Sequence, residues 1–218
     1  MIKKVSLKEK MSEPNSEMEM KPSSESAELG RAFFYGIKKK RNYRRAFPLL
    51  LQAAKEGYVH WQYLVGYALD HGLGVKRDWR GARHWYATAG RRGHPGALFN
   101  LALKYDLGEG VRRNPRKAFL LYKEGAQKGD PEAQCNLAVA YLEGTGTTKN
   151  TREAIRWLKT AAQQDDARAE YNLGRAYLEG TGVKRDPASA RVWLRRAAGH
   201  GHKKAARLLK SNTSESLR

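Results

Sequence analysis

The sequence predicts an all-α protein: a right-handed αα superhelix (solenoid) of about five 36-residue repeats. The main observation is that three kinds of position recur at this constant spacing. The first loop glycine recurs at Gly72, Gly108, Gly144 and Gly180, the second at Gly74, Gly110, Gly146 and Gly182, and a helix alanine at Ala46, Ala82, Ala118, Ala154 and Ala190. A constant period of this size indicates stacked supersecondary units, because one unit alone cannot bury its apolar face.

The first helix of each unit is clearest in the copy at residues 167–202. One helical stripe of this copy is formed by Ala169, Leu173, Ala176 and Tyr177. The spacing of these residues predicts an amphipathic helix. The helix should end at Gly180, because glycine adopts the left-handed conformation of a helix C-terminus without steric cost.

The second helix of this copy should begin after Asp186, which is suited to cap it, with Pro187 at the first helical position. Val183, an apolar residue among polar neighbours, should anchor the loop to the core. The same capping position recurs in the earlier copies at Asp78, Asn114 and Asn150, and the apolar stripe of the second helix consists of Ala190, Trp193, Leu194 and Ala197.

These residues resemble the Sel-1-like repeat family, a relative of the tetratricopeptide repeats with a longer loop between its two helices. The resembling motif is A-x-A-x-x-N-L-G-x-x-Y-x-x-G-x-G-V-x-x-D, followed by A-x-x-W-[LY]-x-x-A-A and G-H. The first copy diverges, because Lys38 replaces the second loop glycine and leaves the turn between its helices open. The predicted organisation is a disordered tail (1–22), repeats at 23–58, 59–94, 95–130, 131–166 and 167–202, a capping helix (203–210) and a C-terminal tail (211–218).

Composition adds a strong positive charge. The chain has 218 residues, and 42 Lys and Arg against 22 Asp and Glu give a net charge of +20. Such a field attracts anionic partners, which include nucleic acid, a membrane surface or an acidic protein. The exception is residues 131–166, where five acidic residues outnumber four basic ones.

The same composition bears on the cellular compartment of the protein and on which methionine starts the chain. A single cysteine, Cys135, fits a reducing compartment, and we expect a cytoplasmic protein. No stretch has the roughly 18 apolar residues that a membrane span requires. Residues 1–26 are charge-balanced, with five lysines and five glutamates, and lack a secretory h-region, and either Met1 or Met11 could be the true start.

Candidate partner-binding residues lie on the first helices, off the apolar stripe. We expect them to line the concave face of the solenoid and to bind a protein partner. Resemblance to tetratricopeptide domains implies that the asparagines bind a peptide backbone or carboxylate, but they could instead tie neighbouring helices together, and the aromatic residues could pack between helices. The candidates are His60, Tyr63, Tyr67, Phe99, Asn100, Asn136, Tyr171, Asn172 and Arg175.

A second candidate surface is a ladder of basic loop residues along one edge. It could follow a phosphate backbone, with salt-dependent affinity, or it could be a solvated charged edge. No sequence signature of a nucleic-acid-binding module accompanies it. The ladder consists of Lys76, Arg77, Arg112, Arg113, Lys149, Lys184 and Arg185, is extended by Arg80, Arg116, Lys117 and Arg152, and continues at the N-terminal end with Lys38 to Arg41, Arg44 and Arg45.

The sequence predicts no catalytic residues, no metal site and no cofactor. The repeat-end histidines, His94 and His202, and the neighbouring His200 have no cysteine or carboxylate cluster at ligand spacing. Cys135 should fill a half-buried slot. The loop glycines join helix to helix and lack the pattern of a phosphate-binding loop.

We therefore predict a non-enzymatic adaptor or scaffold that binds a protein partner, acidic ones included, in the concave groove. The alternative is a nucleic-acid-associated protein that uses the basic edge. An imperfect N-terminal cap at residues 23–58 could also allow a homodimer. Near-consensus repeats, by resemblance, imply a bacterial source.

Overall fold

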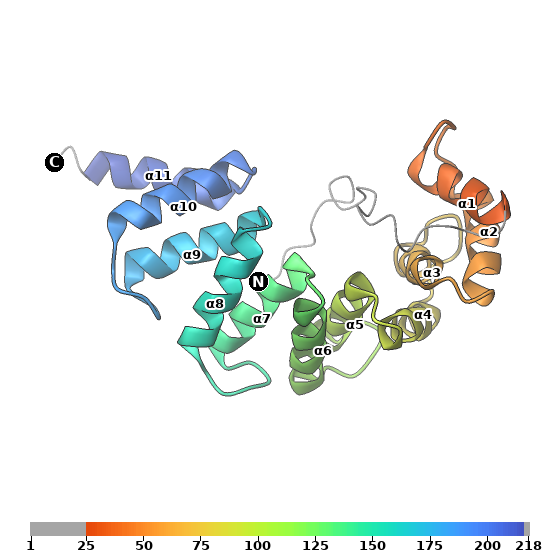
Figure 1. The fold of residues 1–218 in the computed structure, drawn as a ribbon, viewed down its shortest axis with the longest axis horizontal. Coiled ribbons are helices and arrows are strands. Elements are labelled where there is room, and N and C mark those ends of the chain that lie inside the picture. Colours follow the sequence, from red (N-terminus) through yellow and green to blue (C-terminus); the bar gives the residue numbers. More distant parts are fainter. Residues whose placement is uncertain (1–24, 216–218) are drawn as a thin grey trace. The chain divides into compact units, whose positions relative to one another are not determined.

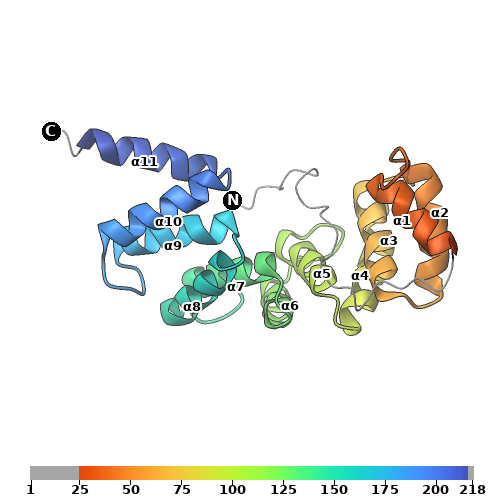
Figure 2. The ribbon, with the colours of Figure 1, turned by 45° about the horizontal axis from the view of Figure 1, so that its top comes forward.

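The structure, a computed structural model, describes residues 25–215, all of whose regular secondary structure is helical (Figures 1 and 2). The predicted disordered tail at 1–22 and the choice between Met1 and Met11 lie outside these residues. The helices are α1 (Glu25–Tyr35), α2 (Tyr43–Lys55), α3 (Val59–His71), α4 (Trp79–Arg91), α5 (Pro95–Leu107), α6 (Pro115–Gln127), α7 (Pro131–Glu143), α8 (Thr151–Ala162), α9 (Ala167–Glu179), α10 (Pro187–Gly199) and α11 (Lys203–Glu215).

The helices form two compact units, Met1–Arg92 and Gly93–Arg218. In the first unit α1 packs on α2, α2 on α3 and α3 on α4. In the second unit each helix from α5 to α11 packs on the next, and α5 also contacts α7. Each repeat is thus a pair of adjacent helices, and pairs stack on pairs within a unit. The predicted all-α class of stacked helix pairs is confirmed.

The second helix of each pair begins at a side-chain cap, as predicted. The cap oxygen accepts a hydrogen bond from a backbone N–H in the first turn, which would otherwise have no partner inside the helix. The bonds run from Arg45 N to Asn42 Oδ1 (3.1 Å), Arg80 N to Asp78 Oδ1 (3.0 Å), Lys117 N to Asn114 Oδ1 (2.9 Å), Glu153 N to Asn150 Oδ1 (3.1 Å) and Ala188 N to Asp186 Oδ1 (3.0 Å).

The repeat-end residues cap the first helices in the same way. Asp130 and Asp166 accept from the N–H groups of Ala133 and Ala169, each at 2.7 Å. His94 accepts through Nδ1 from Ala97 N at 3.2 Å, and His202 does so from Ala205 N at 3.3 Å. The repeat-end histidines are therefore helix caps in this fold.

The second loop position requires glycine for packing as well as for its backbone conformation. Gly74 has φ +72°, and a Cβ atom there would lie 2.1 Å from the carbonyl oxygen of Tyr43, at the start of α2. A side chain at this position would therefore collide with the backbone of the preceding repeat. The turn that was left open in the first repeat does form, since Lys38 adopts φ +53°. No described helix precedes α1, so the turn at Lys38 keeps only the conformational requirement.

The core is built from the periodic apolar positions. Ala169 and Leu173 are fully buried, as are Ala190 and Ala197 in the next helix. Val183 packs against the cluster that contains Leu173, as predicted for a loop anchor. Burial of one leucine side chain stabilises the fold by about 2 kcal/mol, so repeated positions of this kind can hold together helices of 13 residues or fewer, which are marginal alone.

The C-terminal helix is longer than predicted. Residues 203–210 were expected to form a short capping helix, whereas α11 continues to Glu215, into the predicted tail. Ala205 is buried and Leu209 is half-buried against the core, and Lys203, Lys204 and Arg207 are exposed, as expected for a helix that covers the last repeat. Residues 211–215 are all polar, which gave the sequence pattern no apolar stripe to follow.

Candidate partner-binding surface

The nine predicted first-helix residues divide by exposure. Four are buried: His60 (6% exposed), Tyr67 (6%), Phe99 (3%) and Asn136 (5%). Four are half-buried, namely Tyr63, Asn100, Tyr171 and Asn172, and Arg175 is exposed. A side chain must reach solvent to contact a partner, so the last five are the accessible members of this set.

In the first unit the aromatic candidates form a column along α3. The ring centroids of Tyr63 and Tyr67 are 6.2 Å apart, and the ring of Tyr67 stacks on His71 at 4.1 Å. His60, one turn earlier, lies with Nε2 3.3 Å from the Tyr35 hydroxyl of α1. Burial, together with the nearby charge of Arg31, lowers the pKa of His60 to about 4. The contact between His60 and Tyr35 joins α3 to α1. The column therefore agrees with the alternative that the aromatic residues pack between helices.

In the second unit the asparagines connect successive repeats. Arg168 of α9 donates a hydrogen bond to Asn136 Oδ1 of α7. Asn172 Nδ2 of α9 lies 4.0 Å from Cys135 Sγ of α7, within the limit for a hydrogen bond to sulfur. Asn136 and Asn172 therefore connect adjacent first helices, which is the second of the two roles predicted for the asparagines.

The exposed end of this face carries charges on α9. Arg175 donates through Nε to Glu179 Oε1 at 3.0 Å, one turn further along α9. The Tyr171 ring stacks on His202 at 4.3 Å, which fixes its orientation. A partner approaching α9 would therefore meet an oriented ring and an ion pair.

Cys135 is fully buried, and the expectation of a half-buried slot is wrong. Burial raises the pKa of its thiol to about 12, so the thiolate is disfavoured. The neighbouring repeats cover this position more completely than its equivalents Tyr63 and Tyr171, because the small side chain lies inside the packing layer.

The basic loops have a structural role that the sequence analysis did not anticipate. The second basic residue of a loop folds back and donates through Nε to a carbonyl in the last turn of the preceding helix. The bonds are Arg77 to Asp70 O (2.6 Å), Arg113 to Asp106 O (2.8 Å) and Arg185 to Leu178 O (3.1 Å). Arg41, one period before Arg77, donates through Nη2 to Tyr35 O at 3.3 Å. Three of the seven main ladder residues, and Arg41 of its N-terminal continuation, are thus engaged with helix ends.

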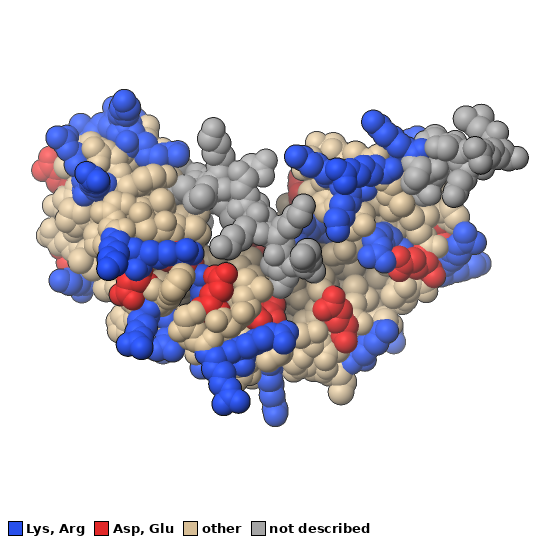
Figure 3. Space-filling view, turned by 180° about the vertical axis from the view of Figure 1, so that it is seen from behind, with Lys and Arg blue, Asp and Glu red and all other residues tan. Residues whose placement is uncertain are grey.

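The remaining loop cations are exposed but do not form one continuous stripe. Lys76, Arg112, Lys149 and Lys184 are all exposed, and the loop of the fourth repeat has Thr148 at the equivalent of Lys76. On the face in Figure 3, Lys and Arg side chains lie in separate groups, with Asp, Glu and uncharged surface between them.

A cleft of about 550 Å³ lies in the first unit between the α1–α2 loop and the α3–α4 loop. Its charged lining residues are Arg41, Arg44 and Lys76, all exposed. The remaining lining residues are Asn42, Tyr43, Gly72, Gly74 and Val75. This lining carries three cations and no carboxylate.

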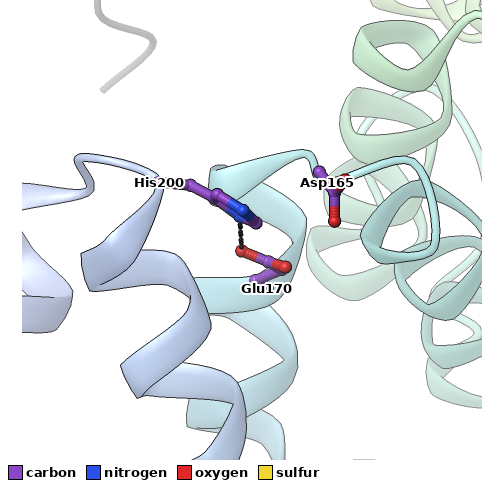
Figure 4. A group of neighbouring side chains, drawn as sticks. All are labelled: Asp165, Glu170 and His200. Atoms are coloured by element: carbon purple, nitrogen blue, oxygen red, sulfur yellow. Dashed lines mark hydrogen bonds and ion pairs between the residues drawn. The ribbon is translucent and has the colours of Figure 1, made fainter.

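Stacking in the last repeat brings together Asp165, Glu170 and His200, whose ligand atoms lie within 4.8 Å of one another (Figure 4). Glu170 is fully buried, and its Oε2 lies 2.8 Å from His200 Nδ1. The Arg196 guanidinium bridges the two carboxylates, with Nε 2.9 Å from Glu170 Oε1 and Nη2 3.0 Å from Asp165 Oδ1. Arg196 therefore supplies the positive charge that a metal ion would supply.

Sequence reasoning missed this cluster because its members are up to 35 residues apart. A signal was present in the repeat alignment, where Glu170 replaces the glutamine seen at Gln62 and Gln134. Those glutamines each donate to a carbonyl at the end of the preceding helix, Ala54 O and Ala126 O, both at 3.2 Å. A glutamate cannot donate, and Arg196 takes over with a bond to Ala162 O at 3.3 Å. The cluster is an ion-pair substitute for a hydrogen bond found in other repeats.

Among the described helices, none is long and apolar enough to cross a membrane.

The fold defines a helical-repeat protein, in which helix pairs joined by glycine-containing loops stack on one another within each unit. The chain belongs to the Sel1 repeat family. That family matches residues 27–58, 62–94, 95–130, 131–166 and 167–202. The resemblance inferred from the sequence is confirmed.

Solved structures support this assignment. A Sel1 repeat protein from Oxalobacter formigenes superposes with a TM-score of 0.80 at 28% identity, over 85% of this chain and 76% of that one. The protein c5321, a protective antigen present in uropathogenic Escherichia coli strains that displays an SLR fold, gives 0.78 at 30% identity. That match covers 84% of this chain but 39% of c5321, so this chain spans well under half of that protein.

A third, more distant structure is the immunity protein Pa5087 from Pseudomonas aeruginosa, with a TM-score of 0.56 at 19% identity over 83% of this chain and 67% of that one. It shares the fold alone. A search of curated proteins found no match to this sequence. Sel1 repeat proteins generally mediate protein–protein interactions on a scaffold fold that is typically non-catalytic.

Proposed function

We propose that this chain is a non-enzymatic adaptor that binds a protein partner on the exposed face of its first helices. The observation that carries the proposal is a contrast between two sets of positions in the second unit. The core positions are the same in successive repeats, as in Ala97, Ala133 and Ala169, or Leu101, Leu137 and Leu173, and all of these are buried.

The accessible positions of the same helices differ from copy to copy. One row reads Leu103, Val139 and Arg175, and the next reads Leu107, Glu143 and Glu179. Leu107 is 43% exposed, and Glu143, Arg175 and Glu179 are exposed. A surface with a constant frame and variable side chains supports partner recognition, since specificity comes from the residues that vary.

The test is site-specific photocrosslinking in the source cells. A photoreactive phenylalanine analogue replaces Arg175 on α9 or, as a control of comparable exposure, Val192 on α10 (56% exposed). We expect a discrete protein adduct from position 175 and none from position 192. Adducts from position 192 alone, or from neither, would contradict binding on the first-helix face.

Three finer expectations belong to the same proposal. We place the adaptor in a reducing compartment such as the cytoplasm, because its sequence has a single cysteine, which cannot form an intrachain disulfide. Homodimerisation through the first repeat would appear as a doubled mass in light scattering. No observation specifically favours the nucleic-acid alternative, since three residues of the basic ladder, Arg77, Arg113 and Arg185, donate hydrogen bonds to helix carbonyls.

A further inference from the structure

We propose that the cleft between the α1–α2 and α3–α4 loops binds the carboxylate side chains of an acidic segment in a protein partner. This inference goes beyond the proposed function, because it concerns a loop edge of the first unit and is independent of the first-helix face of the second.

The cleft converges cations from two successive repeats. Arg41 and Arg44 approach from the start of α2, and Lys76 approaches from the loop before α4. All three are exposed, so they can reach a ligand. A volume of about 550 Å³ accommodates several side chains of a peptide. Three cations without a lining carboxylate make a carboxylate the matching ligand.

The walls of the cleft are fixed by backbone contact. Gly74 lies against the Tyr43 carbonyl so closely that a Cβ atom would come within 2.1 Å of its oxygen. Arg41 is held by its bond to Tyr35 O and lies with its guanidinium carbon 5.9 Å from the Tyr43 ring centroid. A guanidinium has five N–H donors, so this single bond leaves others to bind a ligand. A cleft with a preformed wall loses less conformational entropy on binding.

The observations favour a protein partner over nucleic acid. A phosphate backbone presents charges at regular, close intervals and requires a continuous series of cations. In the second unit the residues at the equivalent positions between the α5–α6 and α7–α8 loops are Arg113, Arg116 and Thr148, so one of the three cations is replaced by an uncharged residue. Three cations stand at the equivalent positions Arg77, Arg80 and Arg112 and at Lys149, Arg152 and Lys184, so the series is interrupted at Thr148. Separate cationic sites fit separate acidic side chains.

The test measures binding of a fluorescein-labelled oligoglutamate peptide to the full chain by fluorescence anisotropy. One variant reverses the cleft cations (Arg41→Glu, Arg44→Glu and Lys76→Glu). A matched variant reverses three exposed cations of the same unit outside the cleft (Lys55→Glu, Arg83→Glu and Arg91→Glu), so that the net charge is equal in both. Circular dichroism confirms that both variants are folded.

We expect the cleft variant to weaken peptide binding by about tenfold or more and the matched variant by less than about threefold. Equal losses would show that only the overall field attracts the peptide, and would overturn the site. Absence of peptide binding to the unmodified chain would overturn it too. Tighter binding of an oligouridylate of the same length, with the same loss in both variants, would assign the charge to nucleic acid instead.

The adaptor proposal is judged separately. The crosslinking partner trapped at position 175 should still be captured by the cleft variant if the two surfaces are independent. Failure of the peptide experiment therefore leaves the first-helix face untouched, and failure of the crosslinking experiment leaves the cleft untouched.

Discussion

The first two repeats follow one template but have different surroundings, and their sequences reflect this. Helix α3 lies between α2 and α4 and buries ten of its 13 residues, whereas α1 packs on α2 and buries three of 11. The loop of the second repeat has Gly74 pressed against α2, whereas the equivalent position in the first repeat is Lys38. The first repeat therefore departs from the template on the side where no described helix packs against it, and a divergent copy need not be a misfolded one.

The largest effect should come from adding a methyl group at the loop contact. Gly74→Ala combines an unfavourable positive φ with a collision against the Tyr43 carbonyl, so we expect a loss of about 3 kcal/mol or more in unfolding free energy. Gly201→Ala is the control, since Gly201 has a similar φ of +83° but no atom within 4 Å of the added Cβ. It should cost about 1 kcal/mol. Equal losses in urea denaturation would mean that the close contact between Gly74 and the start of α2 adds nothing to the cost of the substitution.

The next largest effect is a dependence on pH that comes from the buried α3. The pKa of His60 is about 4 in the fold and 6.5 unperturbed, so the unfolded chain binds the proton more tightly. Stability is then complete above pH 6.5 and falls as the pH drops toward 4, by about 3 kcal/mol in total. His60→Gln should flatten this part of the profile, measured by thermal unfolding between pH 7 and 4. His84→Gln, at an exposed site in the same unit, should leave the slope unchanged.

Removal of the helix cap should lower the unfolding free energy by the same amount in the two repeats, which sharpens the comparison. Asn42→Ala and Asp78→Ala each remove one cap bond, so we expect similar losses of about 1 kcal/mol. Asn42→Asp keeps an acceptor and should be nearly neutral. A cost confined to Asp78→Ala in chemical denaturation would mean that the first repeat contributes little to the stability of its unit.

The smallest effect should have the opposite sign. Lys38→Gly relieves a positive φ in a residue with a side chain, but glycine loses more entropy on folding, so we expect a gain of about 0.5 kcal/mol. Lys39→Gly, at the next position, is the control and should give no gain. A loss for Lys38→Gly in the same urea titration would show that the lysine side chain itself stabilises the loop.

Sequence alone predicted the helix pairs, their caps and their loops, because each depends on local chemistry repeated every 36 residues. The candidate surface was less predictable. Tyr67 and Phe99 lie off the apolar stripe of their own helices, yet both are buried, and Phe99 belongs to a core cluster built from its own repeat and the next one. The ion-pair cluster around Glu170 joins both helices of the last repeat to Asp165 of the preceding one, over up to 35 residues, so no short motif describes it. What depends on stacking requires the structure.

The bonds from the loop arginines to helix carbonyls have an electrostatic consequence. A helix carries about half a negative charge at its C-terminal end, from the aligned peptide dipoles. Arg77, Arg113 and Arg185 each place a cation beside such an end, so part of their charge is compensated locally. Because the two ends of a helix dipole sum to zero charge, the formal +20 is unchanged for a distant partner, and the compensation lowers only the positive potential close to these three loops.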